Sequence, residues 1–329
     1  MIKKTPLNIH SIKVISPMFS YGNRFLEPRP TELKGLLRNT YRVANPKLDM
    51  KVLYQREVEL FGGQLENNRE ITVKSSPLRI KMSDQTRNSN VSKQKLRLHH
   101  EEKWVENGRE QKNYPLDMYD IGKIFTLKLS IHFGYNNFSS IPFLKDKDSI
   151  QWYEDLFRLS LLIGGIGKRS RRGRGCMTTD DLLKISYEEL SKKTAELLNN
   201  ICGSPVYSAH EGKVVLASSK GNDNNRPYIK EIRFGQLLQE ITKDSVKAYL
   251  KKVDQASHDI RDIISKPYVT GFVGPKRFAS SVVVSLAEIK DGIVPVYTLL
   301  NAVCKGFIFK DTEKEQNDFI HSIEEGTKK

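Results

Sequence analysis

The hydrophobic positions of this chain repeat with two periods, and segments of each kind alternate along its first half. A two-residue alternation of apolar and polar side chains predicts a strand, whereas apolar residues three and four apart predict a helix. These patterns predict a strand, two helices, two strands, a helix and a last strand over residues 9–19, 32–44, 48–60, 70–81, 122–133, 149–163 and 176–187. The order is typical of a β-α-β-β-α-β domain of the ferredoxin-like or RRM-like kind.

Residues 83–118 interrupt this domain with a polar, charged stretch that has no clear period. Loops this long are uncommon, so we interpret the stretch as an insertion that is mobile until something binds it. The second half shows helical patterns over 188–201, 235–252 and 312–325, and a β-hairpin pattern over 277–300. The predicted fold class is therefore α+β, with one domain over 1–187 and a second over 188–329.

The composition is typical of a folded protein that binds a polyanion. Of its 329 residues 38% are hydrophobic, and 54 Lys and Arg against 39 Asp and Glu leave a net charge of +15. This charge favours nucleic acid over a membrane surface, because no basic amphipathic helix with a strong apolar face is visible. No apolar run approaches the roughly 20 residues of a membrane span, so we expect a cytoplasmic protein without a membrane partner.

The sharpest local signal is the sequence GGIGKRSRRGRG, residues 164–175, which we call the Gly-rich loop. Glycines let a backbone approach a ligand closely, and arginine forks clamp phosphate oxygens. The alternative is a solvated flexible loop, but the predicted helix and strand on either side anchor both ends. The spacing matches neither GxxxxGK[ST] nor GxGxxG. The predicted phosphate contacts are Lys168, Arg169, Arg171, Arg172 and Arg174.

Two weaker basic signals accompany the loop. Lys34, Arg38 and Arg42 recur every four residues on one face of the first predicted helix, where the alternative is an ordinary solvated face. Lys276 and Arg277 precede Phe278 at the start of the hairpin. A base could stack on this phenylalanine, although a core position is the commoner role.

No arrangement of side chains predicts catalysis, a cofactor or a metal. The seven histidines are scattered, without HExxH or HxH spacing, and we interpret His99 and His100 as surface residues of the insertion. His10 and His132 lie on predicted strands, where structural roles are commoner than catalytic ones. The cysteines have no CxxC spacing, which argues against disulfides and structural zinc. They are Cys176, Cys202 and Cys304.

Four motifs in order resemble the RAMP family of type III CRISPR effector complexes. They are the segment PTELKGLLR at 30–38, the segment EVELFG at 57–62, the Gly-rich loop, and the segment that runs from RFAS at 277–280 to Gly292 and Pro295. Within the family, the chain is most similar to the first RAMP subunit of the type III-B (Cmr) complex.

The resemblance implies two ferredoxin-like domains and no nuclease activity in this subunit. It implies a position near the 3′ end of the crRNA, where the subunit helps to bind or capture target RNA beside other Cmr subunits. The alternative is a crRNA-processing endoribonuclease of the same superfamily, which needs a general base such as His10 or His132. A third possibility is a structural cap that contacts protein and not RNA.

Overall fold

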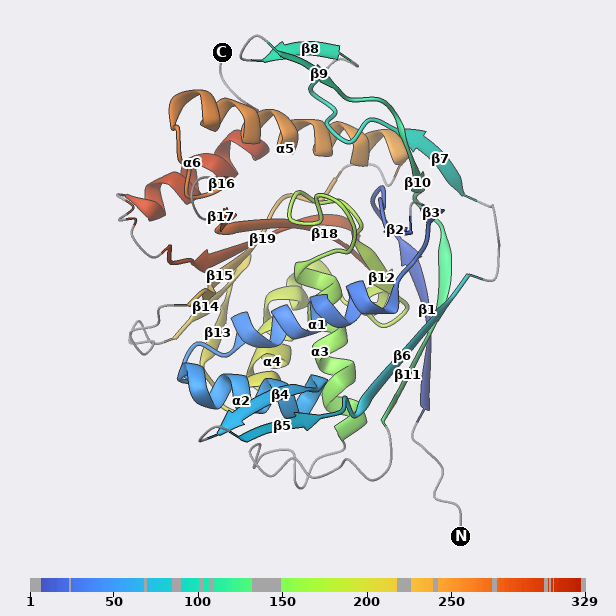
Figure 1. The fold of residues 1–329 in the computed structure, drawn as a ribbon. Coiled ribbons are helices and arrows are strands. Elements are labelled where there is room, and N and C mark those ends of the chain that lie inside the picture. Colours follow the sequence, from blue (N-terminus) through green and yellow to red (C-terminus); the bar gives the residue numbers. More distant parts are fainter. Residues whose placement is uncertain are drawn as a thin grey trace.

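The computed structural model describes residues 7–23, 25–67, 70–84, 90–100, 103–106, 109–131, 149–217, 226–238, 242–273, 277–304, 307, 309 and 311–326. Two larger antiparallel sheets and six helices make up most of this part of the chain (Figure 1). Within these ranges, no helix combines the length and apolar character needed to cross a membrane.

The first sheet contains the strands predicted in the first half. Its antiparallel strands run in the order β12 (Met177–Thr179), β1 (Leu7–Val14), β11 (Ile124–Ile131) and β6 (Leu78–Ser83). The alternation along β11 buries Phe125, Leu127 and Leu129 against the helices and leaves Ile124 half exposed on the other face. The predicted strand at 70–81 divides at Ser76-Pro77 into β5 (Glu70–Lys74) and β6, which belong to different sheets.

Three helices connect these strands in the predicted β-α-β-β-α-β order. They are α1 (Pro30–Ala44), α2 (Met50–Phe61) and α3 (Ser149–Ile163). Asp49 caps α2 by accepting from two backbone amides, and Gly62 ends it with a positive φ. Helix α1 starts two residues before the predicted 32–44 range: Arg29 occupies the cap position, because Pro30 already has the φ that a first helical residue requires.

The second sheet, called the central sheet below, is covered by helices on both faces. Its strands run in the order β13 (Tyr207–His210), β14 (Lys213–Leu216), β15 (Tyr228–Phe234), β19 (Gly292–Asn301) and β18 (Val282–Ile289). The helices of this half are α4 (Tyr187–Cys202), α5 (Lys243–Ile263) and α6 (Thr312–Glu324). The hairpin β18–β19 is as predicted, whereas the helix expected at 235–252 starts only where Thr242 caps it in a reciprocal pair with Ser245.

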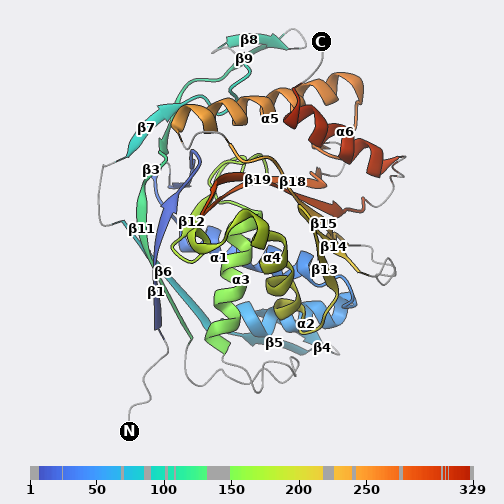
Figure 2. The same ribbon diagram turned by 180° about the vertical axis from the view of Figure 1, so that it is seen from behind.

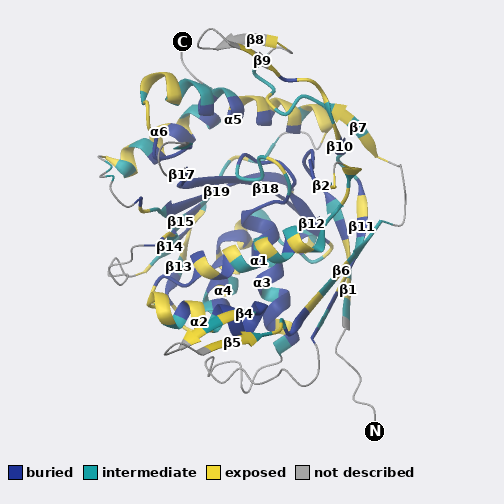
Figure 3. Ribbon diagram, viewed as in Figure 1, coloured by how far each residue is buried: buried dark blue, intermediate teal, exposed yellow. Residues whose placement is uncertain are grey.

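The core is continuous across the proposed boundary at residue 187. Val283 and Ala287 of β18 pack with residues of α1, α3 and α4, whereas Val282 and Val284 pack on α5 and α6. Every residue of β18 is therefore buried (Figure 3). From behind, α4 lies beside α3 (Figure 2). The division into two domains at residue 187 stays a prediction. The strand order of the second half differs from that of a simple β-α-β-β-α-β domain, because β14 lies beside β15 in the sheet.

The described part of the 83–118 insertion forms short strands, and the expectation that the insertion is mobile until something binds it stays a prediction. β7 (Val91–Gln94) pairs with β10 (Leu116–Tyr119), and β8 (Lys103–Glu106) pairs with β9 (Arg109–Lys112). These pairs lie along α5 in both views (Figures 1 and 2). The strands are short and mostly polar, which explains why no periodic pattern revealed them.

Candidate nucleic-acid interface

The Gly-rich loop joins α3 to β12 and is fixed by backbone hydrogen bonds on two sides. The Lys168 amide donates to Phe19 O at 3.0 Å, beside the first sheet. On the other side the Gly173 amide donates to Val284 O at 2.8 Å, and the Val284 amide donates to Arg171 O at 3.2 Å. The loop is therefore an ordered connection between the first sheet and β18, and not a flexible solvated segment.

Glycine is required at the tightest points of this path. Gly175 has φ +67°, and a Cβ there would lie 1.9 Å from the carbonyl oxygen of Ile166. Gly167 has φ +87°, and a Cβ there would lie 2.7 Å from the carbonyl oxygen of Phe19. These glycines let the loop fold closely on itself and on the neighbouring backbone.

Arg174 is completely buried, which corrects its predicted role as a phosphate contact. Its guanidinium donates to both carboxylate oxygens of Asp254 on α5, at 3.1 and 2.6 Å, and Arg169 lies 3.5 Å from the same carboxylate. Burial opposes ionisation of Asp254, but the two guanidiniums hold the pKa of its carboxyl below the usual range. Burial lowers the pKa of Arg169 to about 10, so this side chain is charged at neutral pH.

Arg172 is also buried, and its prediction is corrected for the same reason. Its guanidinium donates to Ser280 Oγ at 3.0 Å, to Val282 O at 3.2 Å and to Thr270 O at 3.1 Å. Burial lowers the pKa of Arg172 to about 9. With these acceptors around it, Arg172 attaches the loop to the central sheet and does not reach the surface.

The two remaining cations of the loop are accessible. Lys168 is exposed, and its ammonium lies 4.7 Å from the centre of the Tyr21 ring. Arg171 is half-buried and donates through Nη1 to Ser280 O at 2.9 Å. Sequence alone gave no means of separating these residues from Arg172 and Arg174, because all of them lie in one short basic run.

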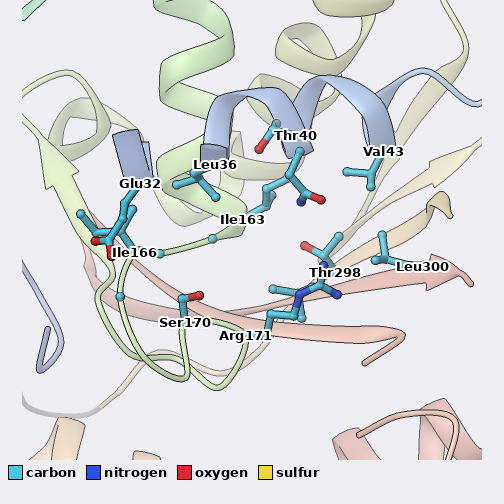
Figure 4. Close-up of a pocket in the computed structure, with 15 residues that line it drawn as sticks. Glu32, Leu36, Thr40, Val43, Ile163, Ile166, Ser170, Arg171, Thr298 and Leu300 are labelled. Atoms are coloured by element: carbon cyan, nitrogen blue, oxygen red, sulfur yellow. The ribbon is translucent and has the colours of Figure 1, made fainter. Parts of the chain in front are cut away.

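A groove lies between the loop, α1 and the central sheet. A cavity of about 280 Å³ lies at the centre of this groove. Figure 4 shows Leu36 and Thr40 of α1 opposite Ser170 and Arg171 of the loop. Thr298 of β19 lies beside them. A second cavity of about 250 Å³ adjoins it. The residues that line both cavities are Asn39, Val43, Arg171 and Leu300. Of these, the sequence pattern predicted only Arg171 as a site residue.

The predicted basic stripe of α1 faces α2 and does not line this groove. Arg42 forms a two-pronged pair with Glu57, and Arg38 lies 3.4 Å from the same carboxylate. Arg38 also donates to the carbonyl oxygens of Phe61 and Gly62 at 3.1 and 2.6 Å. Lys34 is half-buried, and burial followed by the charge of Arg38 lowers its pKa. The stripe is therefore largely engaged in attaching α1 to α2.

The third basic signal is only partly described. Lys276 lies outside the described residues, and Arg277 is described only as part of β17 (Arg277–Ala279). Phe278 is a core residue, as the commoner interpretation expected. It is 6% exposed and packs against Tyr268, Phe272 and Phe309.

The histidines are distributed differently from the sequence interpretation. His10 Nε2 lies 2.8 Å from the buried carboxylate of Glu154 on α3, while His132 lies outside the described residues. His99 and His100 are not simple surface residues, because they meet His258 of α5. More than 150 residues separate them from His258 in the sequence, so no spacing motif could reveal the cluster.

Comparisons with known proteins identify a family and several solved structures that are similar to this chain. A family model described as the RAMP superfamily matches residues 4–178, and no curated protein is a significant match. A chain of the type III-B Cmr-beta complex bound to cognate target RNA aligns with a TM-score of 0.57 and 13% identity, over 98% of this chain and 100% of that chain.

Two further solved structures are similar. The Cmr-beta complex bound to cognate target RNA and AMPPnP, in the presence of ssDNA, contains a chain with a TM-score of 0.55 and 14% identity, over 97% of this chain and all of that chain. Cmr1 from Pyrococcus furiosus in its apo form has a TM-score of 0.50 and 15% identity, over 96% of both chains. The family model covers more than half of the sequence, from before β1 to β12. The chain therefore belongs to the RAMP superfamily.

Proposed function

We propose that this chain is a non-catalytic, RNA-binding subunit of a type III-B CRISPR (Cmr) effector complex, and that it holds the RNA backbone in the groove between α1 and the Gly-rich loop. The observation that carries the proposal is the accessible pair Lys168 and Arg171 on an ordered loop beside this groove. Family membership supports it, and so does the fold shared with chains of Cmr complexes bound to target RNA.

The chemistry of the groove suits a polynucleotide backbone. Arg171 and Ser170 line the groove and supply a guanidinium and a hydroxyl, and Lys168, two residues before Ser170, supplies an exposed ammonium. Contacts of these kinds fix the position of a strand without reading its sequence. The net charge of +15 adds a long-range attraction that speeds encounter with RNA.

The family resemblance supports a proposal for the position of the subunit. We infer that it lies near the 3′ end of the crRNA in a cytoplasmic complex and helps to capture complementary target RNA. His10 does not favour the alternative function of a crRNA-processing nuclease. Its ring nitrogen is engaged by Glu154, and this pair lies between β1 and α3, away from the groove residues.

Replacing both Lys168 and Arg171 with alanine tests the proposal. We expect weaker binding to single-stranded RNAs of unrelated sequence, and a plot of log affinity against log salt that is shallower by about 1.4, because each lost phosphate contact on a single strand removes about 0.7. Fluorescence anisotropy over a salt series measures both quantities. The RNA recovered afterwards should be intact for the unmodified chain.

Lys192→Ala is the matched control, because Lys192 is an exposed cation on α4 and lines neither cavity. Equal affinity and slope for the double variant and this control would refute the groove as the RNA site. Metal-independent cleavage of repeat RNA that disappears in His10→Ala would instead establish the nuclease.

A further inference from the structure

Three histidines from distant parts of the sequence meet between the insertion and α5. His99 and His100 follow β7, and His258 lies on the face of α5 that the insertion covers. The ring centroids of His99 and His100 are 3.9 Å apart, and those of His99 and His258 are 5.1 Å apart. One nitrogen from each ring lies within 4.8 Å of the other two.

The buried member of this group has an unsatisfied nitrogen. The His99 side chain is 7% exposed, and its Nδ1 makes no hydrogen bond, with the carboxylate of Asp254 4.0 Å away. A buried polar atom left without a hydrogen bond costs about 1 to 3 kcal/mol. Imidazole nitrogens are common ligands of zinc.

Carboxylates lie next to the cluster, where they can hydrogen-bond to the histidine rings and orient them. Nδ1 of His258 lies 3.2 Å from Asp262 and 3.8 Å from Asp259, both on α5. A hydrogen bond from one ring nitrogen to a carboxylate fixes the ring and directs the other nitrogen to a metal. Asp254 offsets the positive charge of the nearby Arg169, which lies 3.5 Å from its carboxylate.

We propose that His99, His100 and His258 form a site for a divalent transition-metal ion of the zinc type. Three imidazoles and a water complete a tetrahedral shell. Ligand nitrogens in such a shell are about 3.4 Å apart, so modest side-chain rotations close the present spacing.

The ion would fasten the insertion to α5 behind the Gly-rich loop. The backbone amide of Leu98 already donates to Asp254 at 2.8 Å, and Asp254 pairs with Arg174 of the loop. A metal on the adjacent His99 would stabilise the same contact between insertion, α5 and loop. The site does not depend on the proposed RNA function, because none of its ligands lines the groove.

The test uses the full chain, without a polyhistidine tag and freed of metal by a chelator. Titration with Co²⁺ should give the visible absorption of a tetrahedral complex at one ion per chain, and Zn²⁺ should displace it. His258→Gln should weaken binding about 10-fold or more, and His100→Gln similarly. His321→Gln is the matched control, because His321 pairs with Glu325 at the same helical spacing, on α6, and should leave binding unchanged.

Circular dichroism checks that each variant is folded, and hydrogen exchange gives a second readout. Zn²⁺ should slow exchange of the amides around Leu98 in the unmodified chain but not in His258→Gln. The proposal is overturned if the chain binds no Co²⁺ at micromolar concentration. It is equally overturned if His258→Gln and His321→Gln bind the ion alike, since that outcome indicates surface binding only.

Discussion

Asp254 holds the buried side of the Gly-rich loop, where it pairs with Arg174. It is fully buried on α5, and its carboxylate accepts from the guanidinium of Arg174 and from the amide of Leu98. A buried ion pair is an uncertain source of net stability, but removing one partner leaves an uncompensated charge in the interior. The basic character of the loop is thus partly structural, because the charge of Arg174 neutralises the buried carboxylate of Asp254 and is not available to RNA.

Asp254→Asn should lower the free energy of unfolding by about 3 to 5 kcal/mol, because the buried Arg174 loses its counter-charge. Chemical denaturation at neutral pH measures the change. Asp318→Asn on the exposed surface of α6 is the control and should be nearly neutral. A loss no larger than in this control would contradict the assigned role of the pair.

The same pair predicts a pH dependence. The folded-state pKa of Asp254 lies below its ordinary value of 3.8, so its contribution is present above that value and is lost as pH falls through the folded pKa. The difference in stability between the unmodified chain and Asp254→Asn should therefore shrink in strong acid. A difference that is constant down to that range would show that ionisation of Asp254 is not involved.

At the scale of elements, the Gly-rich loop behaves as a fixed structural unit. Its glycines hold a path that passes within contact of the Phe19 backbone on one side and of β18 on the other. The same path turns Arg172 and Arg174 inward, leaves Arg171 on the wall of the groove and leaves Lys168 exposed. The backbone conformation of the loop therefore decides which of its side chains are available for the proposed RNA contacts.

Gly175→Ala and Gly212→Ala form a matched pair, since both glycines have φ near +65°. A Cβ at Gly212 meets open space, so that variant should lose about 1 kcal/mol from backbone strain alone. A Cβ at Gly175 meets the Ile166 carbonyl, so that variant should lose about 2 to 6 kcal/mol. Equal losses in thermal or chemical denaturation would show that the close approach is not important.

At the scale of the whole molecule, the two halves of the sequence share one core. β18 belongs to the second half, yet one of its faces packs on α3 and α4, and its backbone binds the Gly-rich loop. The groove has the same origin, because α1 and the loop come from the first half and β19 comes from the second. The groove that we propose as the RNA site therefore requires both halves together.

A fragment of residues 1–187 should fail to fold by itself. Its removal from β18 would expose the buried side chains of α3 and leave the loop amide of Gly173 without its acceptor. We expect no cooperative thermal transition and poor dispersion of amide proton shifts, in contrast to the full chain. A fragment that melts cooperatively would support independent domains divided at residue 187.

The sequence by itself determined the elements with strong, local signals. Periodicity predicted α1, α3 and β11, because their apolar residues repeat at helical or strand spacing and pack into the core, and two apolar runs around a turn at residues 290–292 predicted the β18–β19 hairpin, which is buried on both faces. The Gly-rich loop was also recognisable, because glycine and basic residues are concentrated in one short segment between a predicted helix and a predicted strand. Short polar strands such as β7 and β8 left no such pattern, and α5 began later than its amphipathic pattern indicated.

Only the tertiary structure decided what the charged and polar residues do. Composition treats every arginine of the loop alike, whereas the fold pairs Arg174 with Asp254 and leaves Arg171 at the groove. It likewise joins His258 to two histidines of the insertion. The physical reason is that a local pattern reports whether a residue is compatible with burial, while its partners come from segments far away in the sequence.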